Sequence, residues 1–210
     1  MLFNPLDGIL GSTAKVQILR ALLPLTTPVS GREAQRMARV RSRRGTSMAL
    51  DDLFQLGVLQ RTETRGSHLY QVNREHELVS SLSRLFRDEE GRLQEFVSTI
   101  RAGLAARSLV AHVCSLILYG SNARRDATPS SDVDLLAMVD WDSVVAEVRE
   151  ALYDAGHELR RRQGLRISSY VLSVGRVRER VEAGDPLMGT IQKEGRLLMG
   201  ETMDRVTARW

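Results

Sequence analysis

Two aspartates one residue apart follow a Gly-Ser pair in the stretch LYGSNARRDATPSSDVD, residues 118–134. The continuous apolar run before the Gly-Ser pair, residues 113–119, is typical of a buried strand. A helix that begins at Gly120 and Ser121 would direct backbone N–H groups at an anion beyond the strand. The turn therefore predicts a phosphate-binding loop.

Asp132 and Asp134 are separated by one valine and followed by the apolar run LLAMV. Because alternate residues of a strand share a face, we expect both carboxylates to project from the same face at the start of a second strand. Two neighbouring carboxylates repel each other unless a cation lies between them, and oxygen ligands favour Mg²⁺ or Mn²⁺. A metal beside a phosphate site is what nucleotidyl transfer requires, so both aspartates are predicted metal ligands and catalytic residues.

The stretch GSNARRDATPSSDVDLL resembles the signature of the nucleotidyltransferase superfamily that includes DNA polymerase beta, and in particular its minimal nucleotidyltransferase branch. The resemblance implies that the Gly-Ser pair holds the β- and γ-phosphates of an NTP and that the two aspartates hold the metal. Arg125 stands where the branch usually has glycine, which predicts a different backbone path or an extra phosphate contact. The predicted nucleotide-binding residues are Gly120, Ser121, Arg124, Arg125 and Ser131.

Active members of this superfamily place a third carboxylate on the next core strand. Here a helix is expected over residues 141–155, with Asp140 as its cap and Gly156 as its stop, followed by the strand LRISSYVLSV. Ser168 and Ser169 occupy the expected place, and serine supplies neither the charge nor the basicity of a carboxylate. Glu158 falls too early in this alignment. The resemblance thus implies NTP and Mg²⁺ (or Mn²⁺) as cofactors and leaves the transfer chemistry open.

The composition is that of an ordinary globular protein, with 42% hydrophobic and 27% charged residues among 210, enough for one domain or two small ones. With no membrane-length apolar run and no secretory signal pattern, we expect a cytoplasmic protein and no membrane partner. The single cysteine, Cys114, excludes an intrachain disulfide and is expected to be a small buried side chain. The four histidines show no ligand-like spacing and are interpreted as structural or surface residues.

The first third of the chain carries the positive charge. Residues 1–74 contain 11 basic and 5 acidic side chains, whereas the remainder contains 19 and 21. Three helices are predicted here: one begins after Ser12, one after Ser30 with Glu33 in a capping box, and one after an Arg-rich turn. A hairpin around Arg65-Gly66-Ser67 is predicted to follow them. The expected apolar face of the third helix comprises Met48, Leu50, Leu53, Phe54 and Leu56.

Residues 10–75 resemble the bacterial winged helix-turn-helix regulators, in which the third helix enters the major groove and the hairpin touches the DNA backbone. Side chains suited to phosphates and base edges cluster at the start of the third helix and on the hairpin. A solvated arginine face is the alternative interpretation. The predicted contacts with double-stranded DNA are Arg39, Arg41, Arg43, Arg44, Thr46, Ser47, Arg61 and Arg65.

Residues 75–107 show a helical period with an expected break near Gly91. Such a connector either forms a homodimer or packs on its own chain, and both alternatives are open. In the tail, residues 174–201 predict a helix, a Gly-Asp-Pro turn and a second helix ending at Gly200.

The predicted fold class is α+β: a winged helix-turn-helix domain at 1–74, a helical connector at 75–107, and at 108–210 a minimal nucleotidyltransferase-like domain with a mixed sheet flanked by helices. The favoured function is a DNA-binding transcriptional regulator whose second domain binds NTP with Mg²⁺. The alternative is an active nucleotidyltransferase that moves NMP from NTP to a protein hydroxyl, as in toxin-antitoxin pairs, or to a small molecule. A third class is a protein-interaction module without either activity.

Overall fold

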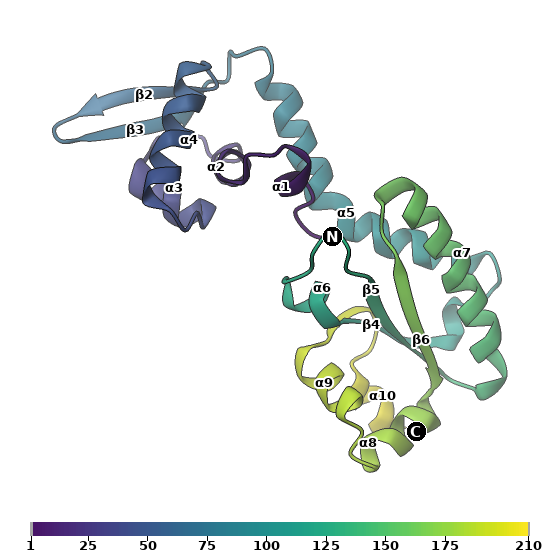
Figure 1. Ribbon diagram of the computed structural model, residues 1–210. Coiled ribbons are helices and arrows are strands. Elements are labelled where there is room, and N and C mark those ends of the chain that lie inside the picture. The colour runs from purple at the N-terminus through teal and green to yellow at the C-terminus, as the bar shows by residue number, and fades with distance from the viewer. Residues whose placement is uncertain (1, 210) are drawn as a thin grey trace. The chain divides into compact units, whose positions relative to one another are not determined.

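The computed structural model describes residues 2–209, which form two compact units (Figure 1). One unit is Asn4–Gly91, and the other runs from Arg92 onward and includes Leu2 and Phe3. Across the described span, no helix is both long and apolar enough to cross a membrane. The boundaries predicted after residues 74 and 107 both fall inside these units, and the three-part division stays a prediction.

The N-terminal unit contains α1 (Leu6–Ile9), α2 (Thr13–Leu22), α3 (Gly31–Ala38) and α4 (Arg43–Gln55), followed by the hairpin β2 (Leu59–Thr64) and β3 (Ser67–Val72). A short strand, β1 (Val29–Ser30), adds to β3, so the sheet order is β1-β3-β2. The three predicted helices and the hairpin are therefore present. Their apolar faces meet in one core built around Ile18, Leu22, Leu50, Leu59 and Tyr70.

Serine caps set the starts of α3 and α4. The Ser30 hydroxyl accepts a hydrogen bond from the Glu33 N–H at 3.3 Å, and the Glu33 carboxylate accepts one from the Ser30 N–H at 2.9 Å, which completes the predicted capping box. The Ser42 hydroxyl accepts from the Gly45 N–H at 3.0 Å and begins α4. Ser12 precedes α2 but its side chain makes no capping bond.

The buried face of α4 differs from the predicted one. Thr46, Ala49, Leu50 and Leu53 are buried, whereas Met48 is 56% and Leu56 62% exposed. Two residues along a helix correspond to a rotation of about 200°, so a side chain two positions after Thr46 points away from the core. The prediction is therefore confirmed for Leu50 and Leu53 and wrong for Met48 and Leu56.

The helix α5 (Val79–Ala105) is continuous, so the break predicted near Gly91 is wrong. An internal glycine costs a helix only about 1 kcal/mol relative to alanine, and apolar anchors lie on both sides of this one. Phe86 is buried in the core of the N-terminal unit, and Phe96 and Ile100 in the core of the C-terminal unit.

The C-terminal unit is built on a mixed sheet of order β6-β5-β4-β7. The strand β4 (Val113–Tyr119) pairs antiparallel with β5 (Val133–Val139) and with β7 (Arg196–Gly200), while β5 and β6 (Ile167–Ser173) run parallel. The second half of α5 and α7 (Val145–Gln163) cover one face. The other face packs against α8 (Val174–Glu182), α9 (Pro186–Glu194) and α10 (Met203–Arg209), so the predicted mixed sheet flanked by helices is confirmed (Figure 1).

Two predicted helix ends are wrong, and glycine is misread in both. The helix α7 passes through Gly156, where a Cβ would meet Ile167 at an ordinary 3.7 Å, and ends instead at Gly164, whose φ is +67°. Asp140 is not the cap of α7, because the helix begins at Val145 with Val144 at the N-cap position. The Asp140 carboxylate accepts instead from the N–H of Trp141. In the tail, α9 ends at Glu194, and the residues up to Gly200 form β7, which pairs with the free edge of β4.

Candidate functional site

The turn after β4 brings Gly120 directly against Asp134. Gly120 has a φ of +69°, and a Cβ added to it would lie 2.4 Å from the Oδ2 atom of Asp134. The left-handed backbone favours glycine, and this approach leaves no room for a Cβ unless the Asp134 carboxylate moves. The short helix α6 (Gly120–Arg124) begins here and includes Ser121. Its start lies next to the carboxylate of Asp134, at the beginning of β5.

A buried asparagine organises the loop around this turn. Asn122 is 1% exposed. Its Oδ1 accepts from the Leu2 N–H at 3.1 Å, and its Nδ2 donates to the Asp132 carbonyl at 2.7 Å. Leu2 is itself 1% exposed, and the Phe3 ring lies 5.4 Å from the Arg125 guanidinium. The first residues of the chain therefore fasten onto the loop that carries the aspartates.

Arg125 replaces the glycine that the minimal nucleotidyltransferase branch usually has, and its backbone conformation shows which path the loop takes. Its φ is +64°, so its backbone adopts the left-handed conformation that glycine favours. The loop thus keeps a glycine-like path with a charged side chain. Arg124 is held by two carboxylates, at 3.1 Å from Asp126 and 3.3 Å from Glu194, and these bonds raise its pKa.

The two aspartates lie in different settings. Asp132 precedes β5, is about half exposed, and forms an ion pair of 2.8 Å with Arg166, which also donates to the Ser130 carbonyl. Exposed pairs of this kind stabilise a protein by about 0–1 kcal/mol, so a ligand can displace the partner at little cost. Ser131 accepts a hydrogen bond from the Thr128 N–H at 2.9 Å and serves the loop's own geometry.

The charge of Asp134 is only partly compensated. Burial is the main factor that raises its pKa above the ordinary 3.8, repulsion from Asp132 adds to the rise, and Arg124 offsets part of it. Its antiparallel neighbour Tyr119 also has a raised pKa, chiefly through burial and then through the charge of Asp134. A cation bound at Asp134 would lower the pKa of this carboxyl and would offset the effect of its charge on Tyr119.

The strand register identifies the residue at the position of the expected third carboxylate. Ser168 pairs with Asp134 across β5 and β6, and side chains that pair in register share a face. Ser169 lies on the opposite face, beside α7. Glu158 is on α7, which covers that opposite face, and it pairs with Arg162 at 3.4 Å. The two serines and Glu158 therefore do not supply the expected third carboxylate.

The carboxylates of Asp132 and Asp134 are better suited to a Mg²⁺ ion that binds together with a nucleotide than to a metal held by the protein alone. No group of three His, Cys, Asp or Glu side chains that could hold a metal occurs among residues 2–209. Mg²⁺ commonly takes one or two carboxylates and completes its shell with water and substrate phosphates. Asp134 and Asp132 suit that arrangement.

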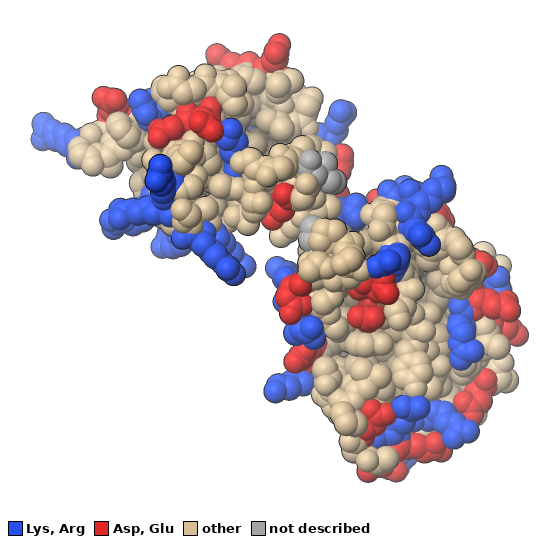
Figure 2. Space-filling view, viewed as in Figure 1, with Lys and Arg blue, Asp and Glu red and all other residues tan. Residues whose placement is uncertain are grey.

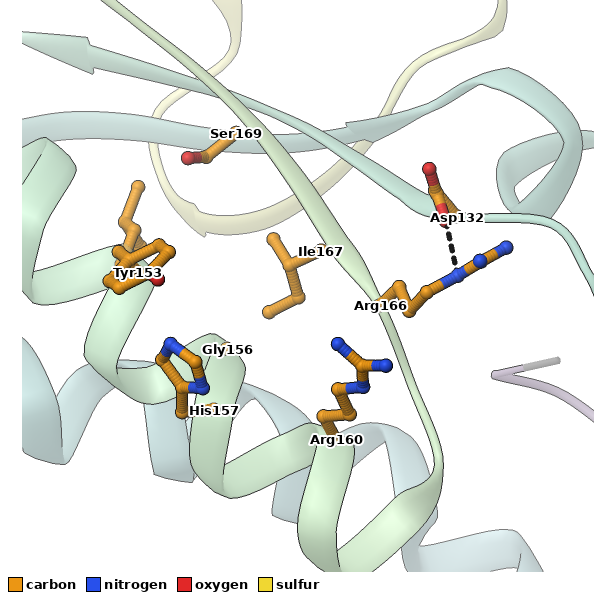
Figure 3. Close-up of a pocket in the computed structure, with 9 residues that line it drawn as sticks. Asp132, Tyr153, Gly156, His157, Arg160, Arg166, Ile167 and Ser169 are labelled. Carbon is orange, nitrogen blue, oxygen red and sulfur yellow. Dashed lines mark ion pairs between the residues drawn. The ribbon is translucent and has the colours of Figure 1, made fainter.

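A pocket of about 310 Å³ lies between α7 and β6, beside Asp132 (Figure 3). The sequence patterns did not predict this pocket, and His157, which lines it, was expected to be a structural or surface residue. Tyr153, His157 and Arg160 are spaced by four and three residues, which places them on one face of α7, and this spacing is the signal that could have found the site. The remaining lining residues are Leu152, Gly156, Arg166, Ile167 and Ser169.

The predicted DNA-binding residues divide into two groups. Arg39, Arg41, Arg43, Arg44 and Arg65 are exposed, and within the described span no carboxylate pairs with any of them. Figure 2 shows basic side chains gathered on the side of this unit where α3 lies in Figure 1 and at the hairpin tip.

The other three predicted contacts are placed less favourably for DNA. Thr46 is 2% exposed and donates its hydroxyl to the Ser42 carbonyl, so it serves α4 itself. Arg61 lies over the Phe54 ring at 4.3 Å and 3.5 Å from Asp51. Ser47 is exposed, with its hydroxyl 3.4 Å from Asp51.

Comparison with known proteins agrees with this geometry in the C-terminal unit. Residues 97–183 match the family model of the nucleotidyltransferase domain, which confirms the predicted superfamily for this part of the chain. No curated protein matches the chain.

Two solved structures are weakly similar. A toxin-antitoxin structure with AMP-PNP is 14% identical over 54% of this chain and 82% of its own, with a TM-score of 0.34. Human N-acetylserotonin methyltransferase in complex with SAM is 12% identical over 89% of this chain and 44% of its own, with a TM-score of 0.29. Likenesses this low carry no conclusion about function.

Proposed function

We propose that this chain is a DNA-binding transcriptional regulator whose nucleotidyltransferase domain binds NTP with Mg²⁺ and uses it as a signal. The observation that carries the proposal is the β5–β6 register, which sets Ser168 beside Asp134 where a third carboxylate would activate an acceptor. A serine hydroxyl is neither a charged metal ligand nor a base at neutral pH. The domain would therefore retain nucleotide binding and lack nucleotidyl transfer.

The nucleotide site consists of the Gly120-Ser121 turn and the two aspartates. Backbone N–H groups of the turn, with Arg124 and Arg125 nearby, are suited to phosphate oxygens. Asp134 and Asp132 would hold Mg²⁺, which neutralises phosphate charge when it is bound. Arg166 holds the Oδ1 atom of Asp132 and would compete with the ion for this carboxylate.

The DNA site is the arginine cluster of the N-terminal unit. Arginines without carboxylate partners present their full charge to phosphates, and those at the first turn of α4 lie where a recognition helix meets DNA. Arg65 at the hairpin turn would reach the backbone as a wing does.

A physical link between nucleotide and DNA is supported by the N-terminal segment. Leu2 and Phe3 belong to the C-terminal unit, and the chain enters the N-terminal unit at Asn4. Because Asn122 bonds both Leu2 and Asp132, a shift of Asp132 toward a cation would act on the segment that leads into the DNA-binding unit. Such coupling requires that nucleotide bind the two DNA states with different affinity.

Label transfer tests the loss of catalysis. The chain is incubated with α-phosphate-labelled ATP, CTP, GTP or UTP and Mg²⁺ or Mn²⁺, alone and in lysate of its host, beside Asp134→Asn and Ser168→Asp. We expect no label with the wild-type chain, and any label with Ser168→Asp would show that the rest of the site is competent.

Active transfer is the second candidate, favoured by the retention of Gly120 and both aspartates in their close arrangement. The acceptor would be a protein hydroxyl, such as that of a toxin partner, or a small molecule. Label that appears with the wild-type chain and disappears with Asp134→Asn would establish this activity and overturn the regulator without catalysis. The mass of the labelled product would then identify the acceptor.

A further inference from the structure

We propose that the pocket between α7 and β6 binds a nucleoside monophosphate, at a site separate from the Gly120-Ser121 turn. The pocket and the turn use different elements. The residues that line the pocket come from α7, from β6 and Arg166 just before it, and from Asp132 (Figure 3). The Gly120-Ser121 turn lies after β4 and faces Asp134.

One end of the pocket is suited to a flat ring. Tyr153 lines this end and is 67% exposed, so its ring is accessible to a ligand. Its ring meets His157 edge to face, with 4.5 Å between the centroids and an interplanar angle of 86°. This contact fixes the tyrosine ring and leaves a face free for stacking, while Leu152 and Ile167 supply an apolar floor.

The other end of the pocket is suited to a phosphate. Arg160 lines it without an ion pair to any described residue, and Arg166 has only the exposed carboxylate of Asp132 as its ionic partner there. Two guanidinium groups bind a phosphate dianion more strongly than one binds a carboxylate, because both charge and donors are doubled. Ser169 lies toward the Tyr153 end of the pocket in Figure 3, where its hydroxyl can hydrogen-bond to the base.

The size of the pocket agrees with a mononucleotide. Its volume of about 310 Å³ is at the lower end of the range for small-molecule sites. A ring at the tyrosine end and an anion at the arginine end together describe a base with its phosphate.

A consequence follows for Asp132, and it depends on the proposed function. A phosphate that takes Arg166 frees the Asp132 carboxylate for the Mg²⁺ ion at Asp134. A monophosphate in the pocket would then tighten binding of Mg·NTP at the turn, and the reverse, by the same factor. The binding of the monophosphate itself requires no metal and no NTP.

Calorimetric titration of the full chain with AMP, GMP, CMP and UMP in EDTA tests the binding. We expect at least one of them to bind, with about tenfold or greater weakening in Tyr153→Ala, as for the loss of a stacked base, and a similar loss in Arg160→Gln. Tyr153→Phe should bind as the wild type does. Arg161→Gln, one residue further along α7 and outside the pocket, is the matched control and should change nothing. Because Tyr153 is exposed, its loss should leave the melting temperature unchanged.

Three results would overturn the proposal: no binding of any monophosphate at millimolar concentration, equal binding by Tyr153→Ala and Arg160→Gln, or binding of inorganic phosphate as tight as that of the monophosphate. Asp134→Asn separates this proposal from the proposed function. It should bind the monophosphate normally in EDTA even if Mg·NTP binding at the turn proves absent in the wild-type chain.

Discussion

Gly120→Ala tests the close approach on which the candidate site is built. The left-handed backbone at Gly120, with φ +69°, costs an L-residue about 1–2 kcal/mol. The new Cβ would also lie 2.4 Å from the Oδ2 atom of Asp134, and moving that carboxylate off its rotamer costs about 0.5–1.5 kcal/mol. We therefore expect the free energy of unfolding to fall by about 2–3 kcal/mol, measured by urea denaturation at pH 7 without metal.

A double-mutant cycle separates the two contributions. In an Asp134→Ala background the nearest remaining atom of residue 134 is its Cβ at an ordinary 3.6 Å, so only the backbone cost of Gly120→Ala should persist. The cost should be smaller there by about 1 kcal/mol, which is the coupling energy of the contact. Equal costs in the two backgrounds, or no cost in either, would refute the geometry described for this turn.

Three further predictions concern charge. Since the pKa of Asp134 is raised in the folded state, its ionisation opposes folding, and stability is lost as pH rises from 3.8 through the folded pKa; Asp134→Asn should raise the metal-free melting temperature at pH 7, and the gain should vanish below pH 3.8. A lowered melting temperature at pH 7 would contradict this. In the N-terminal unit, Arg20→Met leaves Glu89, whose side chain is 5% exposed, without its 2.7 Å partner and should cost about 3 kcal/mol in urea denaturation; a cost under 1 kcal/mol, as expected for a surface pair, would show that the pair is solvated. Arg43→Ala should weaken binding to duplex DNA of any sequence and reduce the salt slope of log K by about 0.9, and an unchanged slope would remove Arg43 from the contacts.

The site aspartates could be predicted because their signal is local. Gly-Ser, a gap and Asp-x-Asp between two apolar runs specify a strand, a turn and a strand, and the structure has these at β4, α6 and β5. The position where the third carboxylate is expected could be limited to Ser168 or Ser169 from the sequence. The choice of Ser168 required the β5–β6 register, which depends on pairing between distant residues.

What failed to be predicted depends on tertiary contacts. Gly156 looks like a helix stop in isolation, but α7 continues through it, packed beside Ile167, and ends at Gly164. The residues after Gly195 look helical, yet a free edge of β4 offers hydrogen bonds that convert them into β7. The pocket could not be predicted either, because Tyr153 and Arg166 come to line one cavity only when α7 packs beside β6.

The most direct test of the central claim is the affinity of the chain for duplex DNA, measured by fluorescence anisotropy with and without saturating Mg·NTP, in the wild type and in Asp134→Asn. We expect salt-dependent DNA binding that Arg43→Ala weakens, and a change in affinity of at least threefold on addition of Mg·NTP that is absent in Asp134→Asn. A wild-type chain whose DNA affinity is the same with and without Mg·NTP, or that binds no DNA at low salt, would contradict the claim.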